Sequence, residues 1–159
     1  TAVAMLCEMA AVEKEKGKTL FEKLIDIYIK YGFYKERLLS ITKKGIHGQK
    51  EIAEMIEQYR TRPPETINGL QVTELFDYET GVQKNLLTGE TSKITLPKSN
   101  VIQFILSDGS KITARPSGTE PKIKFYFSIK HTLENSNEFD LRNKEAEDKI
   151  DAIIKDMGF

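Results

Sequence analysis

The residues best suited to chemistry stand together in one segment, which runs from Arg115 to Lys122 (Arg-Pro-Ser-Gly-Thr-Glu-Pro-Lys) and is followed by Lys124. An arginine guanidinium is a planar fork that can hold two phosphate oxygens at once, and serine and threonine hydroxyls add short neutral donors. Gly118 lets the backbone turn so that successive N–H groups point at one anion. Two prolines stiffen the segment and reduce the ordering that binding requires. The pattern therefore predicts an anion-binding loop.

A plain turn is the alternative interpretation of the same segment. Between two strands, a Ser-Gly-Thr sequence is more often a turn than a ligand site. The flanking Arg115, Lys122 and Lys124 favour binding, because a turn has no need of converging positive charge. From Lys111 to Lys130, five basic residues stand against the single acid Glu120. The residues alone leave the two interpretations about evenly balanced.

The predicted loop joins two strands. In residues 123–129, apolar side chains alternate with polar ones, so one face of that strand is expected to lie in a core. Upstream, residues 107–110 predict a hairpin turn between strands 101–106 and 111–115, because an Asp-Gly pair accepts positive φ at low steric cost. Residues 70–76 also favour a strand. Residues 33–42 favour a strand over an extended connector, and residues 77–98 are expected to form a long loop with room for a short hairpin.

Four helices are predicted from apolar positions that recur every three to four residues. The first ends at Gly17, and the second follows a capping-box pattern of Thr19 and Glu22. The third begins near Gln49, and the fourth begins near Asp140. This order of elements predicts the α+β class: an antiparallel sheet with helices packed on one face, preceded by an α-hairpin.

Composition sets the limits on the kind of protein. The 24 basic and 24 acidic residues balance, so no overall field draws the chain to nucleic acid or to a membrane. The single Cys7 stands in an apolar run and is expected to be a buried structural thiol in a cytoplasmic setting. No run approaches the roughly 20 apolar residues that span a bilayer. Because the first residue is not methionine and a helix is expected from the outset, we expect a fragment of a longer protein.

The segment Arg-Pro-Ser-Gly-Thr-Glu-Pro-Lys-Ile-Lys, residues 115–124, resembles the C-terminal phosphate-binding loop of the α-D-phosphohexomutases along its whole length. Four further stretches resemble the phosphoglucomutase and phosphomannomutase branch of that family. Residues 17–20 and 31–36 are similar to the end of its third domain. Residues 77–81 and 107–110 are similar to its fourth domain. The resemblance covers essentially the whole chain.

The resemblance implies a TBP-like fourth domain at residues 45–159, preceded by a C-terminal remnant of the third, sugar-binding domain at residues 1–44. The glycine-punctuated residues 43–48 are the predicted boundary. In such enzymes, a phosphoserine on the first domain passes its phosphoryl group to a sugar phosphate, and Mg²⁺ is held on the second domain. The resulting hexose bisphosphate turns around and returns the other phosphoryl group. The net reaction interconverts hexose 1-phosphate and hexose 6-phosphate.

The fourth domain of the family holds the phosphate that is not being transferred. By resemblance, Arg115, Ser117, Gly118 and Thr119 would contact that phosphate, and Lys124 would be a fifth contact. The serine and metal loops of the family do not occur in this sequence. The expected chain therefore contains no catalytic residue and no metal ligand and is inactive alone, while the full-length enzyme is an intramolecular phosphotransferase.

The expected partners are a sugar phosphate and the other domains of the same polypeptide, with no nucleic acid and no membrane. A stand-alone module that binds polyanions or nucleic acid is the alternative from another class. Such binders usually spread positive charge along a face, whereas here the basic residues gather around one compact loop.

Overall fold

The computed structural model describes residues 1–43 and 45–159, and Lys44, the last residue of the predicted third-domain remnant, lies outside them. The helices are α1 (Ala2–Glu15), α2 (Leu20–Tyr31), α3 (Gly45–Thr61) and α4 (Phe139–Asp156), with a 3₁₀ turn η1 (Ser136–Glu138) before α4. The strands are β1 (Phe33–Thr42), β2 (Thr66–Ile67), β3 (Leu70–Asp77), β4 (Val82–Asn85), β5 (Thr91–Lys93), β6 (Ile102–Leu106), β7 (Lys111–Pro116) and β8 (Lys122–His131).

The strands form an antiparallel sheet in the order β1-β8-β7-β6-β3-β4-β5, with β2 paired to β3 at one side. The predicted strands and the turn at residues 107–110 are confirmed, and in that turn Gly109 has φ of 83°. The short hairpin allowed for within residues 77–98 is the pair β4 and β5. The sheet is therefore built largely from consecutive hairpins. The last strand, β8, pairs with the first strand, β1, which forms one edge of the open sheet.

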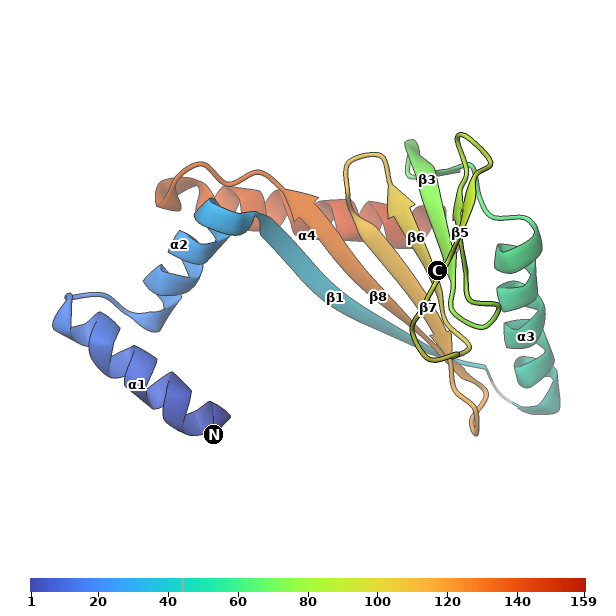
Figure 1. Ribbon diagram of the computed structural model, residues 1–159, viewed down its shortest axis with the longest axis horizontal. Coiled ribbons are helices and arrows are strands. Elements are labelled where there is room, and N and C mark those ends of the chain that lie inside the picture. The colour runs from blue at the N-terminus through green and yellow to red at the C-terminus, as the bar shows by residue number, and fades with distance from the viewer. Residues whose placement is uncertain (44) are drawn as a thin grey trace.

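Both long helices of the C-terminal part cover the same face of the sheet. Side chains of α3 and α4 share one core with β6, β7 and β8, and the alternating residues 123, 125, 127 and 129 of β8 are all fully buried in it. Figure 1 shows α4 lying along the sheet behind β1 and β8, with α3 at the far end beside β7. The predicted α+β class, with helices packed on one face of an antiparallel sheet, is confirmed.

The opposite face of the sheet carries the polar residues of the alternation. The register sets Arg115 opposite Lys124, Thr113 opposite Tyr126, and Lys111 opposite Ser128. A strand sends successive side chains to opposite faces, so these residues project away from the core that α3 and α4 cover. Arg115 and Lys124, which flank the predicted loop, thus share one face.

The α-hairpin precedes the sheet. Thr19 caps α2: its hydroxyl accepts a hydrogen bond from the Glu22 N–H at 3.1 Å, and the Glu22 carboxylate accepts one from the Thr19 N–H at 2.7 Å. Helix α2 reaches α4 through aromatic contacts, since Tyr28 and Phe139 stack with ring centroids 6.3 Å apart. None of the described helices combines the length and the apolar character needed to cross a bilayer.

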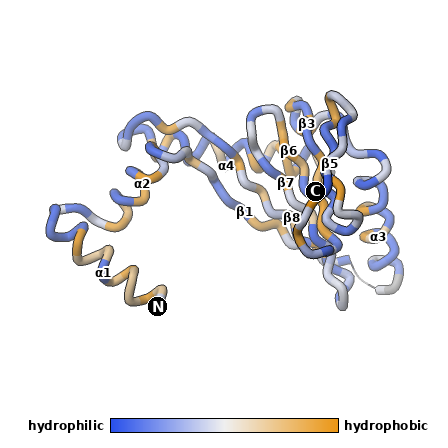
Figure 2. Tube along the Cα trace, in the orientation of Figure 1, coloured by the Kyte–Doolittle hydropathy of each residue, from blue (hydrophilic) through white to orange (hydrophobic). Residues whose placement is uncertain are grey.

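Helix α1 lies away from the body of the molecule (Figure 1), and its hydrophobic residues are uncovered (Figure 2). Val3 is 74% exposed and Met5 is 61% exposed. Cys7 is exposed as well, so the prediction of a buried thiol is wrong for the described residues. The apolar run around Cys7 correctly predicted a helix, but a helical period does not say which part of a protein covers the apolar face.

The sheet also crosses the predicted domain boundary. Strand β1 pairs with β8 over ten residues, from Phe33 opposite His131 to Thr42 opposite Lys122. Residues 33–42 therefore belong to the same sheet as the strands of residues 45–159. Helix α3 begins at Gly45, within the predicted boundary and four residues before the predicted start at Gln49. The division at residues 44 and 45 remains a prediction.

Candidate anion-binding site

The predicted loop forms the wall of a cavity of about 340 Å³ between the ends of β7 and β8. All five predicted contacts line it: Arg115, Ser117, Gly118, Thr119 and Lys124. Pro116, Glu120 and Lys122 complete the lining. Sequence reasoning placed Lys122 in the loop but did not name it as a contact, although its charge was visible. The structure brings the three basic side chains to one small cavity.

The loop is held in shape by its own hydrogen bonds. At its base, the Ser117 N–H donates to the Lys122 carbonyl at 2.7 Å, and the Lys122 N–H donates to the Glu120 carbonyl at 2.8 Å. At its tip, the Ser117 hydroxyl oxygen accepts from the Glu120 N–H at 3.2 Å and more weakly from the Thr119 N–H at 3.4 Å. The hydroxyl hydrogen of Ser117 is not used in these bonds and can be donated to an anion.

The backbone of Gly118 adopts a conformation that any residue could adopt. Its backbone is not in the left-handed region, and a Cβ added to it would meet nothing within 4 Å. The loop conformation itself therefore does not require glycine at this position. A glycine still permits the closest approach of a ligand to the backbone.

The electrostatics of the cavity favour an anion. Arg115 and Lys124 are direct cross-strand partners, and like charges directly opposite one another destabilise a sheet. Among the ion pairs of the described residues, none involves Arg115, Lys122 or Lys124. Glu120 also lines the cavity and offsets part of the charge. The surplus positive charge has no matching acid in the described part of the chain, and a bound anion would relieve it.

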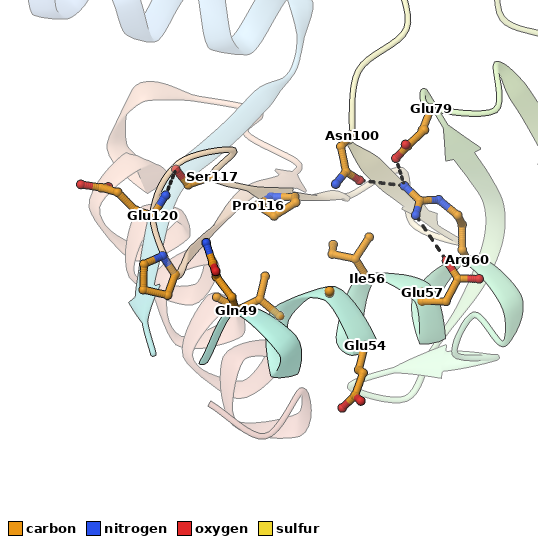
Figure 3. Close-up of a pocket in the computed structure, with 13 residues that line it drawn as sticks. Gln49, Glu54, Ile56, Glu57, Arg60, Glu79, Asn100, Pro116, Ser117 and Glu120 are labelled. Carbon is orange, nitrogen blue, oxygen red and sulfur yellow. Dashed lines mark hydrogen bonds and ion pairs between the residues drawn. The ribbon is translucent and has the colours of Figure 1, made fainter. Parts of the chain in front are cut away.

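A larger cavity of about 500 Å³ lies on the other side of the same loop, against α3 (Figure 3). Ile52, Ala53 and Ile56 supply its apolar part, and Pro116, Ser117 and Pro121 form the wall it shares with the loop. In Figure 3, Ile56 points into the space between Pro116 and the Arg60 network.

Arg60, on the wall of the larger cavity, is already committed to other groups. Its Nε lies 3.2 Å from Asp77, and its Nη2 lies 2.8 Å from Glu79 and 2.7 Å from Asn100. Burial acts to raise the pKa of Asp77, but hydrogen bonds from Thr80, the Glu79 N–H and Arg60 hold that pKa below its ordinary value. The Asp77 carboxylate therefore stays charged and keeps the guanidinium engaged. The smaller cavity, and not this one, has the free cations that an anion needs.

The cavity also differs from a metal centre. In residues 1–43 and 45–159, no three side chains of His, Cys, Asp or Glu come together as they would around an ion. The side chains lining the loop cavity are mainly donors and cations, which suit an oxyanion and repel a divalent metal.

Comparison with known proteins finds several relatives that are named phosphoglucomutase. The chain is 40% identical to a phosphoglucomutase of Staphylococcus saprophyticus over 136 residues, which make up 86% of this chain and 24% of that protein. It is 37% identical to a phosphoglucomutase of Staphylococcus epidermidis, covering 93% of this chain and 26% of that protein. It is 41% identical to one of Staphylococcus aureus, covering 80% and 23%. The chain thus spans about a quarter of the length of the curated relatives it matches.

No family model matches the sequence. Among solved structures, the open form of pp63/parafusin, a phosphoglucomutase from Paramecium, aligns with a TM-score of 0.43 and 17% identity, over 88% of this chain and 25% of that one. A TM-score below 0.5 does not establish a shared fold. The sequence relatives are phosphoglucomutases, so they confirm the resemblance of this chain to the α-D-phosphohexomutases, and the similarity fits a C-terminal fragment of such an enzyme.

Proposed function

We propose that this chain is the phosphate-holding C-terminal part of a phosphohexomutase, and that its loop grips the phosphate that is not being transferred. The observation that carries the proposal is the cross-strand pair of Arg115 and Lys124, two like charges at the mouth of one cavity that also contains the Ser117 hydroxyl. The proposed contacts are Arg115, Ser117, Gly118, Thr119 and Lys124, with Lys122 as an addition from the geometry.

Arg115 would hold two oxygens of the phosphate through its fork, and the Ser117 and Thr119 hydroxyls would donate to the others. Binding a phosphate remote from the reacting bond fixes the orientation of the sugar and supplies binding energy that can be used at the reacting centre. Loss of a loop contact would therefore lower the rate of the full-length enzyme as well as its affinity.

The full-length protein is proposed to be an isomerase of carbohydrate metabolism in the cytoplasm, acting on glucose or mannose phosphates through a hexose bisphosphate. Mg²⁺ would supply charge neutralisation at the transferred phosphoryl group, and its ligands and the reactive serine are proposed to lie outside this chain. The chain alone is then expected to bind a sugar phosphate without turning it over.

We also propose that α1 and α2 belong to the preceding, sugar-binding domain. The uncovered apolar residues of α1, among them Val3 and Met5, support this proposal because such a face is normally buried against further structure. A longer chain that contains the rest of that domain should protect Cys7 from a thiol reagent. Equal labelling of Cys7 in the longer and shorter chains would contradict the assignment.

A titration with glucose 6-phosphate and with glucose, followed by the amide signals of the loop, tests the binding role. We expect glucose 6-phosphate to shift the signals of Ser117 and Thr119, and glucose to leave them unchanged. Salt should weaken this binding only slightly, since one phosphate is held. Tight binding of a single-stranded oligonucleotide with a steep salt dependence would favour the polyanion-binding alternative instead.

A further inference from the structure

The loop is held from outside as well as from within. The Lys43 N–H donates to the Pro121 carbonyl at 2.8 Å, so the pairing of β1 with β8 continues one residue beyond the last strand pair, Thr42 with Lys122. Pro121 is the second shoulder of the loop, and the neighbouring Lys122 carbonyl receives the Ser117 N–H. Backbone hydrogen bonds thus link Lys43 to Pro121 and, through the adjacent Lys122, to Ser117.

Helix α3 packs closely against Lys43 at Gly48. A Cβ added to Gly48 would lie 2.6 Å from the Lys43 Cβ and 2.7 Å from its carbonyl carbon and oxygen, far inside van der Waals contact. Gly48 is buried, and one and two turns later Ile52 and Ile56 fix the helix in the core, where they are 5% and 2% exposed. The absent side chain at residue 48 is therefore what lets the Lys43 main chain sit against the helix and reach Pro121.

We propose that Gly48 is a positioning residue for the phosphate loop, acting through the Lys43 main chain. This inference rests on the proposed function of the loop. Gly48 does not line the loop cavity and lies 69 positions before Ser117 in the sequence. Its role is to leave space for the main chain of Lys43, whose N–H keeps Pro121 and Lys122 in place.

An alanine at residue 48 would force a displacement. Ordinary contact begins at 3.4 Å, so a separation of 2.6 Å must grow by about 0.8 Å. Because the core anchors α3, the Lys43 main chain moves more easily than the helix. A shift of that size along the Lys43–Pro121 bond would lengthen 2.8 Å to about 3.6 Å, which is no longer a hydrogen bond. Alanine favours a helix more than glycine does, so helix propensity cannot explain a loss of binding.

The test measures the affinity for sulfate of the 159-residue chain, from the amide signals of Ser117, Thr119 and Glu120. Gly48→Ala displaces the Lys43 main chain by adding a methyl group on helix α3. Lys43→Pro removes the donor itself, and the strand conformation of Thr42 is one that a following proline accepts. Lys43→Ala is the matched control, because it loses the same charge and the Glu51 ion pair but keeps the N–H. Gln58→Ala controls for a change in the same helix, because Gln58 is exposed and lies away from the loop.

We expect roughly two- to tenfold weaker sulfate binding in Gly48→Ala than in Gln58→Ala, and in Lys43→Pro than in Lys43→Ala, as one lost hydrogen bond predicts. Faster hydrogen exchange of the Lys43 amide in Gly48→Ala is the structural signature. If Gly48→Ala does not fold, the two Lys43 variants decide alone. Sulfate binding at the loop that is equal within each pair overturns this inference and leaves the proposed function standing. A wild-type chain that does not bind sulfate at the loop overturns both.

Discussion

Replacing Arg115 with glutamine should change the stability of the chain in opposite directions with and without an anion. In the absence of a ligand, Arg115 stands directly opposite Lys124 in the β7–β8 register, and no acid of the described residues is ion-paired with either. Removing one charge of this pair relieves a repulsion. In the presence of sulfate, the same substitution removes the best donor for the anion.

The size of each effect follows from the geometry. A cross-strand charge pair contributes about 0.2–1 kcal/mol, and the exposed position of Arg115 puts the expected gain in the lower half of that range. An anion at ten times its dissociation constant stabilises the folded chain by about 1.4 kcal/mol, since only the folded state binds it. The variant should therefore be slightly more stable than wild type without sulfate and about 1 kcal/mol less stable with it.

Urea unfolding at matched ionic strength, with chloride and then with sulfate, measures both effects. Sulfate also stabilises proteins in general, so Lys111→Gln serves as the control. Lys111 lies on the same strand and the same face but does not line the loop cavity. A loss of stability in Arg115→Gln that is equal in chloride and in sulfate would show that the arginine has a structural role. It would contradict the proposal that Arg115 binds the anion.

Four other variants test the fold and the loop. Gly118→Ala should leave the free energy of unfolding nearly unchanged, because a Cβ there meets nothing within 4 Å, yet weaken sulfate binding; a large loss of stability would show that the loop itself needs the glycine. Asp77→Asn should make the free energy of unfolding depend less on pH in acid. The pKa of Asp77 is lowered in the folded state, so the stabilisation by its carboxylate is complete above the unfolded pKa of about 3.9 and is lost as pH falls through the folded pKa. Urea unfolding from pH 2.5 to 6 checks this, and parallel curves for the two proteins would contradict it. Phe127→Ala, at a fully buried position, should cost about 3–5 kcal/mol in the same assay, and a cost under about 1 kcal/mol would mean that the face is not core. Thr19→Ala should cost about 1 kcal/mol through loss of the α2 cap, and an unchanged free energy of unfolding would contradict that role of Thr19.

Local patterns in the sequence predicted most elements of the fold. The alternation of residues 123–129 gave the buried face of β8, and the Thr19 and Glu22 pair gave the start of α2. These signals succeed because they depend on neighbours a few residues apart. The gathering of the proposed contacts around one cavity was predictable for the same reason, since they all lie within ten consecutive residues, 115–124.

Features that depend on distant parts of the chain were not predictable in the same way. The exposure of Cys7 depends on what packs against α1, which no helical period encodes. The pairing of β1 with the last strand joins residues about 90 positions apart, and the alternation in β1 does not name its partner. The hydrogen bond from Lys43 to Pro121 is of the same kind, because a backbone N–H carries no sequence signal.

The proposal that the loop at residues 115–122 holds a phosphate is tested most simply by a crystal structure of the chain soaked in phosphate or sulfate. We expect tetrahedral density in the loop cavity, within hydrogen-bond distance of Arg115, Ser117 and Thr119 and close to Lys124. A loop that stays empty at high anion concentration, while anions are found at other surface cations, would contradict it.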